Sequence, residues 1–341
     1  MYITPAKWRP RFVLHLRDSG VTLKMFRKIR PAVHALDRVA QISLAAFLVP
    51  ALAGAWVFCV PTGTAAQTQP GETAAAPPTA GPDPSAGQIE SGFYYMYVLD
   101  FQGARVQFVD YQKAHPDDPL GTVSEAASYL YEQFNVKGVL SSAFFLDNDK
   151  FLGGVDGTPA ENKNEQFLDA NHRARDMSNK RLKSNPQDAE GLLALTLADG
   201  MESDYDALIV KKPMAGLSLM KQANAEAAKL LEVDPTAQDA YVALGAANYV
   251  IGCMPSFKKA FLWFDGVHGD RVKGMQEMQL AADKGRYLSP FAKVLLALAY
   301  EREHQPDQAR ALLKELSDEF PSNPLYAREL ALVDHQPPRN K

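Results

Sequence analysis

The chain has 341 residues, 46% of them hydrophobic and 22% charged, which is enough for one or two folded domains with a substantial core. Residues 1–40 carry nine Lys or Arg and two Asp or Glu, a net charge of +7, whereas the remainder has 27 basic and 38 acidic residues, a net charge of −11. The acidic charge of residues 41–341 argues against nucleic-acid binding. The sequence has only two cysteines, Cys59 and Cys253, which excludes a disulfide framework, a CxxC pair and a zinc knuckle.

Residues 1–40 form a basic N-terminal region that precedes an apolar segment. Ile42 to Val60 are nineteen residues without a charge. Basic residues followed by an apolar run are typical of a signal peptide or a signal anchor. At a rise of ~1.5 Å per residue, the run is also long enough to cross a hydrocarbon core of ~30 Å. We therefore expect export or membrane association through this segment.

The end of the apolar segment leaves two outcomes open. Small residues at Thr64 and Ala66 would suit cleavage after Ala66, so residues 41–66 are predicted to be either a cleaved signal peptide or a retained anchor. The basic region is longer than usual, which leaves open whether translation begins at Met1 or at Met25. Residues 67–88 are rich in Pro, Ala, Gly and Thr and are predicted to be a disordered linker.

One spacing recurs along residues 89–335, ahead of a short tail at 336–341. It consists of a small residue, core positions four and seven residues later, and a proline five residues after that. The copies are Ala104, Phe108, Tyr111 and Pro116; a more polar version at Ala174, Ser178, Arg181 and Pro186; Ala223, Ala227, Leu230 and Pro235; and Ala309, Leu313, Leu316 and Pro321. The small residue lets two helices approach closely, the apolar residues form a buried stripe, and the proline ends the helix.

The last copy is the most complete, because Leu296, Ala297 and Tyr300 precede Ala309 at gaps of 1, 3 and 9. The whole series resembles the tetratricopeptide-repeat family, and the looser copies extend this resemblance over residues 89–333. The resemblance implies an all-α fold in which antiparallel helix pairs stack as a right-handed α-solenoid. It also implies a surface that binds other proteins.

The period departs from that family. Leu192, Leu195 and Thr196 are matched 49 residues later by Tyr241, Leu244 and Gly245, whereas the usual period is about 34. The extra 15 to 17 residues fall between the two helices of each unit. Insertions of this kind are predicted to lie on one face of the solenoid, often the binding face.

Other residues mark where helices begin and end. Asp188, Ser289 and Ser322 are predicted N-caps, and Gly252 and Gly285 are predicted helix exits. The order Gly269-Asp270-Arg271, Leu280-Ala281-Ala282 and Gly285-Arg286-Tyr287 is similar to the inclusion-body-clearance repeat proteins of the mitochondrial outer membrane. That likeness implies a divergent helical-repeat scaffold and carries over no catalytic residue.

An aromatic group stands in the second insertion. Phe257, Phe261 and Phe264 share one helical face, and Trp263 lies beside them. Such a stripe is more often core than a binding surface, so packing onto its own repeat and contact with a partner both stay open. These four residues are the candidate partner-binding site.

The sequence offers no catalytic, cofactor or metal site. His115, His172, His268 and His304 fall in separate units without a partner at ligand spacing, and the sequence contains no HExxH, GxxxxGK or GxSxG motif. We therefore expect no enzyme activity, no cofactor and no metal.

The leading hypothesis is a non-catalytic repeat scaffold of the cell envelope, periplasmic or otherwise extracytoplasmic, that binds a protein or peptide. The alternative is an accessory or ligand-binding subunit of a transport system that holds a small or lipidic ligand. An enzyme is a third reading, and it would require a cluster of His, Glu or Cys in the folded chain.

Overall fold

The computed structural model describes residues 82, 87–147, 161–254 and 268–335, and all of its helices lie in one compact unit, Ala74–Lys341. These residues form α-helices and one π-helical segment and contain no strand. The elements in chain order are α2 (Gln88–Tyr97), α3 (Phe101–Ala114), α4 (Pro119–Val136), α5 (Ser142–Phe145), α7 (Glu161–Ser184), α8 (Ala189–Asp204), η1 (Tyr205–Ile209), α9 (Pro213–Val233), α10 (Ala240–Cys253), α12 (Arg271–Lys284), α13 (Ser289–Arg302), α14 (Pro306–Glu319) and α15 (Pro324–Asp334).

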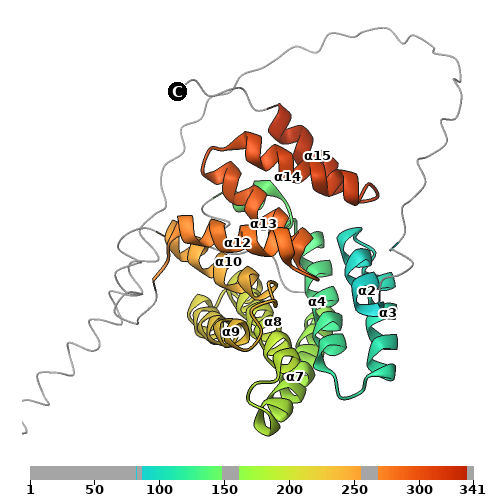
Figure 1. Ribbon diagram of the computed structural model, residues 1–341. Coiled ribbons are helices and arrows are strands. Elements are labelled where there is room, and N and C mark those ends of the chain that lie inside the picture. Colours follow the sequence, from blue (N-terminus) through green and yellow to red (C-terminus); the bar gives the residue numbers. More distant parts are fainter. Residues whose placement is uncertain (1–81, 83–86, 148–160, 255–267, 336–341) are drawn as a thin grey trace, which may run out of the picture. The chain divides into compact units, whose positions relative to one another are not determined.

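Each long helix packs chiefly against the helices before and after it in the chain (Figure 1). Short turns reverse the direction between α3 and α4, α7 and α8, α9 and α10, and from α12 through α15. This arrangement is a stack of helix pairs, in agreement with the all-α repeat predicted from the sequence. No helix of the described ranges is both long and apolar enough to cross a bilayer. The predicted membrane segment, Ile42 to Val60, lies outside these ranges, as does the cleavage position after Ala66.

The repeat-defining residues occupy the positions that the spacing predicted. The small residues Ala104, Ala174, Ala223 and Ala309 are all fully buried, each 2% exposed or less. The prolines Pro116, Pro186, Pro235 and Pro321 each stand two residues beyond the last residue of a helix. This placement follows from the steric clash that keeps the residue before a proline out of the α-helical region.

The extra residues of the first long unit do not form a separate insertion, so that prediction is wrong for this unit. Helix α8 continues directly into the π-helical segment η1, and α9 begins only four residues after it, at Pro213. The additional residues lengthen α8 and α9, which pack against each other, and they continue the apolar stripe. Where the two helices meet, the hydroxyl of Ser203 donates to the carbonyl of Gly216 at 2.8 Å. The corresponding residues of the second unit, 255–267, lie outside the described ranges.

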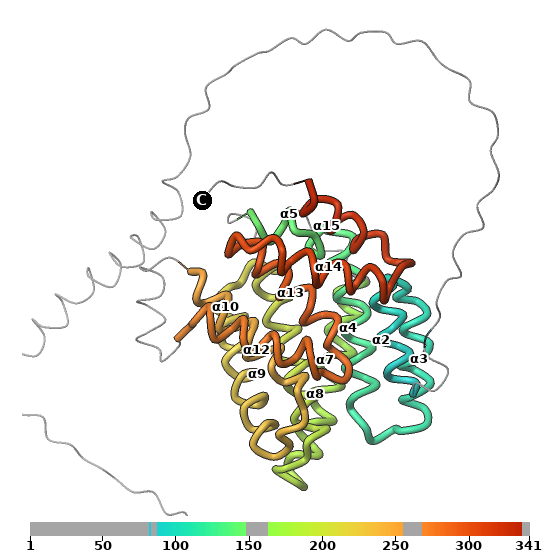
Figure 2. The backbone as a smooth tube through the Cα atoms, turned by 45° about the horizontal axis from the view of Figure 1, so that its top comes forward, coloured from blue at the N-terminus to red at the C-terminus, as the bar shows by residue number. Residues whose placement is uncertain are grey.

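The stack curves until its first helix contacts its last ones (Figure 2). The rings of Phe93 on α2 and Tyr287 before α13 stack with centroids 5.5 Å apart, and the Tyr97 hydroxyl donates to the Tyr287 carbonyl at 2.7 Å. Tyr94 packs against Phe320, which follows α14, at 5.7 Å. These contacts join the two ends of the described stack.

Candidate functional site

The curved stack surrounds a partly open apolar cavity of about 400 Å³. Its wall is contributed mainly by α2, α4, α8, α9, α10, α13 and α15. Pockets that hold small-molecule ligands typically measure ~300–1,000 Å³. Large apolar side chains on the wall include Phe93, Met96, Val123, Phe134, Met201, Leu208, Leu217, Met220, Val250, Phe291 and Leu295.

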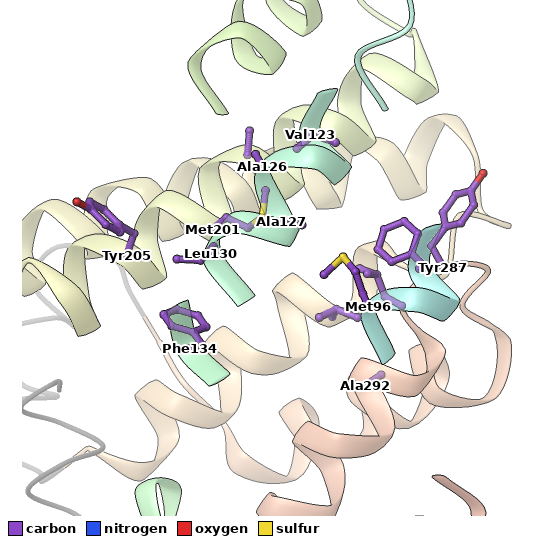
Figure 3. Close-up of a cluster of buried hydrophobic side chains, with 14 of the residues drawn as sticks. Met96, Val123, Ala126, Ala127, Leu130, Phe134, Met201, Tyr205, Tyr287 and Ala292 are labelled. Atoms are coloured by element: carbon purple, nitrogen blue, oxygen red, sulfur yellow. The ribbon is translucent and has the colours of Figure 1, made fainter. Parts of the chain in front are cut away.

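The wall is rigidly supported, because many of its side chains also belong to the main hydrophobic core. Met96 of α2, Val123 and Phe134 of α4, and Met201 of α8 line the cavity and are buried members of one continuous cluster (Figure 3). Helices such as α4 and α8 are packed by neighbouring helices on one side and face the cavity on the other. Their apolar residues therefore spread over more than one face, as the weak amphipathicity of α8 indicates.

The charged residues on the cavity wall are all acidic. Asp204, Asp239, Glu301 and Glu329 line it, whereas no Lys, Arg or His is among the described residues that do so. A cavity with this lining has no side chain that could neutralise an anionic ligand. Its electrostatic preference is for a positive charge or a hydrogen-bond donor.

Three of these carboxylates have partners within the protein. Asp239 accepts hydrogen bonds from the backbone N–H groups of Tyr287 and Leu288, at 3.1 and 2.8 Å, and thereby holds the turn before α13. Burial nevertheless raises the pKa of Asp239. Glu329 accepts from the hydroxyl and the backbone N–H of Ser142, and Glu301 also makes an interaction within the chain.

Asp204, at the end of α8, differs from the other three. Its side chain makes no hydrogen bond or ion pair within the part of the chain that the structure describes. The residue is exposed, and it lines the cavity. Burial raises the pKa of Asp204 to about 7. An ionisable group perturbed by burial and facing a cavity is a candidate for function.

Aromatic side chains form another part of the wall. The ring of Tyr131 on α4 lies 5.3 Å from that of Phe291 on α13 and 5.9 Å from that of Phe134, both edge to face. Burial raises the pKa of Tyr131 well above its usual value, and the charge of Asp204 raises it further. Tyr131 and Asp204 both line the cavity.

A second hollow, of about 410 Å³, lies on α3, α4 and α7 and is polar. Glu132 forms ion pairs there with Arg105, at 3.0 Å, and with Lys163. Burial acts to raise the pKa of Glu132, but hydrogen bonds from Lys163 and Arg105 hold it below its usual value. The guanidinium of Arg105 also lies over the Tyr129 ring, 4.9 Å from its centroid. The positive and negative side chains that line this hollow balance one another.

The candidate partner-binding residues from the sequence, Phe257, Phe261, Trp263 and Phe264, lie outside the described residues. Sequence reasoning missed the cavity and Asp204. A signal existed: Leu197, Met201, Asp204 and Leu208 recur at helical spacing and all line the cavity, so that Asp204 interrupts an apolar stripe. Among the described residues, no three His, Cys, Asp or Glu lie together as a metal site would require.

Comparison with known proteins gives a general likeness. No protein-family model matches the chain, and no curated protein matches it. The crystal structure of a thermophilic TPR protein in Thermus thermophilus aligns with 73% of this chain and 98% of its own, at 14% sequence identity and a TM-score of 0.40. The repeat fold itself rests on the helix pairs and buried repeat residues described above. The chain is an all-α protein of stacked helix pairs that resembles tetratricopeptide-repeat proteins.

Proposed function

We propose that this chain is a non-catalytic binding protein that holds a ligand with an apolar body inside its curved stack of helices. The observation that supports the proposal is the 400 Å³ apolar cavity to which seven helices contribute. Stacked helix repeats generally serve as binding scaffolds. In this chain the contacts between α2 and the C-terminal helices narrow the concave face to a cavity.

The energetics favour occupation by an apolar molecule. An empty cavity of this kind costs stability, because its lining atoms lack packing partners. Each buried CH₂ group of a ligand is worth about 0.8 kcal/mol, so a medium-length alkyl chain would bind without many polar contacts. Large apolar cavities in proteins can stay dry and accept apolar molecules.

A neutral fluorescent dye, N-phenyl-1-naphthylamine, tests the proposal. We expect saturable binding to the protein with enhanced emission. Ala246→Trp and Ala243→Phe place large side chains on the cavity-lining face of α10 and should abolish binding. Ala311→Trp, at an exposed position of α14, should leave it unchanged. Absence of saturable binding, or equal binding by folded Ala246→Trp and Ala311→Trp, would overturn the proposal.

A protein or peptide ligand is the second candidate, and the polar hollow on α3, α4 and α7 is the observation that favours it. This hollow combines charges of both signs with the half-exposed Val106, as a peptide groove requires. A photo-crosslinker at Val106 should give a discrete adduct in cells, whereas one at the exposed Val272 of α12 should not. Identical adduct patterns from the two positions would contradict a role for the hollow.

The location of the protein is also a proposal. The basic region and the uncharged Ile42 to Val60 support export or tethering, with the helical unit on the extracytoplasmic side. Terminal sequencing of protein from the soluble and membrane fractions tests it. A mature N-terminus at Gln67 would show cleavage after Ala66, an intact apolar segment in membranes would show anchoring, and an intact soluble protein in the cytoplasm would contradict both.

A further inference from the structure

One carboxylate on the cavity wall has no partner among the described residues. Asp204 lines the cavity and is exposed, and its carboxylate makes no hydrogen bond or ion pair with the described residues. A ligand that fills the cavity would displace water from this carboxylate, which costs free energy unless the ligand itself donates to it.

The charge distribution narrows the choice of ligand. An alkanoate or a phospholipid phosphate would bring a negative charge into a wall that carries four carboxylates and, among its described residues, no cationic side chain. One of the four, Glu329, is ion-paired with Arg328 at 2.8 Å, which leaves Asp204 as the carboxylate without a partner among the described residues. A purely apolar ligand would leave Asp204 desolvated and unpaired. An ammonium group would supply both the counter-charge and the N–H donors.

The aromatic residues point to the same chemistry. Tyr131, Phe134 and Phe291 contribute π surface to the wall that also carries Asp204. Cations bind favourably over aromatic faces, and more strongly where water is excluded. A cavity lined by aromatic rings and a carboxylate is a suitable environment for an organic ammonium ion.

We propose that the cavity binds a cationic amphiphile, whose ammonium group pairs with Asp204 while its alkyl chain occupies the apolar remainder. This inference rests on the proposed function, since it names the class of ligand that the same cavity takes. Asp204 acts as the specificity-determining residue. The apolar wall supplies most of the affinity.

The test is competition against bound N-phenyl-1-naphthylamine at pH 8, using decylammonium, decanol and decanoate below their micelle concentrations. These three probes share one chain length and differ in head-group charge. For the wild-type protein we expect decylammonium to displace the dye at a concentration about tenfold or more below that of decanol, as one buried charge-assisted contact implies. Decanoate should be the weakest competitor.

Two variants assign the preference to one carboxylate. Asp204→Asn should reduce the advantage of decylammonium over decanol to about twofold or less, while decanol itself competes as before. Asp206→Asn, two residues along the same segment and absent from the cavity wall, should keep the wild-type preference. Both variants should retain dye binding, which reports that the cavity is intact.

The outcomes separate the two proposals. Dye binding without any preference for decylammonium, or a preference that survives Asp204→Asn, would overturn the inference and leave the apolar binding function standing. Failure of the dye to bind the wild-type protein would remove both. A stronger effect of decanoate than of decylammonium would show that the site takes anions and would also overturn the inference.

Discussion

The side-chain amide of Asn323 donates a hydrogen bond to the backbone carbonyl of Tyr97 at 2.8 Å, across 226 positions of sequence. The same side chain caps α15, because its oxygen accepts from the N–H of Leu325 at 2.9 Å. Asn323 therefore starts the last helix and fastens it to the end of the first described helix. Contacts of this kind hold the first and last described helices together, and the cavity depends on them.

We predict that Asn323→Asp destabilises the protein by about 1–3 kcal/mol, because it keeps the capping oxygen but leaves the partly buried Tyr97 carbonyl without its donor. Urea-induced unfolding measures the change. The matched control is Asn185→Asp, in an exposed turn where only the side-chain oxygen is used, and it should shift stability by less than about 0.5 kcal/mol. Equal stability of the two variants would show that the Asn323–Tyr97 contact contributes little.

The crossing of α10 and α12 provides a second prediction. A methyl group at Gly274 would lie 2.6 Å from the backbone nitrogen of Tyr249 and 2.7 Å from the carbonyl oxygen of Gly245. Because backbone atoms cannot move aside locally, Gly274→Ala should separate the helices and cost about 1–3 kcal/mol.

Gly200 in the middle of α8 is the matched control for that crossing, since a methyl group there meets nothing within 4 Å. Gly200→Ala should stabilise the protein by up to about 1 kcal/mol, the difference in helix propensity. Thermal unfolding of both variants, followed by circular dichroism, checks the pair. The prediction fails if both substitutions shift stability in the same direction.

Local chemistry explains how much of the fold the sequence could predict. The prolines and the buried alanines act within one helix and its neighbour, so their spacing was sufficient to place four helix ends and the small residues at helix crossings. Asp188 likewise caps α8, accepting from the N–H of Gly191 at 2.8 Å.

Long-range contacts explain what the sequence could not predict. Ser289 was predicted to cap α13, but Leu288 occupies the cap position. Asp239, which precedes α10, accepts from the N–H of Leu288, and the Ser289 hydroxyl donates to the carbonyl of Ala282. Ser322 was displaced as a cap by Asn323. The cavity depends on contacts between residues that are 190 or more positions apart in the sequence. No local sequence pattern encodes such contacts.

A buried ion pair between α7 and α8 gives a third prediction. The guanidinium of Arg175 contacts the carboxylate of Asp199, which is 3% exposed, with the Nε donor at 2.8 Å. Arg175→Met would leave that carboxylate unpaired, and we expect a loss of about 3–5 kcal/mol in urea unfolding at pH 7.5.

Two further measurements identify the unpaired charge as the cause. Burial already raises the pKa of Asp199, and removing Arg175 would raise it further, so the loss should shrink as the pH falls toward 5 and the carboxyl group becomes protonated. The double variant Arg175→Met, Asp199→Asn should cost less than Arg175→Met alone. A loss that is independent of pH and unchanged in the double variant would indicate lost packing instead.

Asp204 gives the last prediction, which concerns stability without any ligand. Its pKa is about 7 in the folded protein against 3.8 for an ordinary Asp, so between these values the folded state binds the proton and the unfolded state releases it. The stability of the wild-type protein should therefore fall as the pH rises through this window, with the full cost present above about pH 7. Asp204→Asn cannot ionise and should unfold at a higher temperature than the wild-type protein at pH 8.

The difference in unfolding temperature between Asp204→Asn and the wild-type protein should close toward pH 4. For the control variant Asp206→Asn, the difference from the wild-type protein should depend less on pH, since burial raises the pKa of Asp206 less strongly. A gap between Asp204→Asn and the wild-type protein that stays constant from pH 4 to pH 8 would mean that the Asp204 carboxylate is solvated rather than held in the apolar wall.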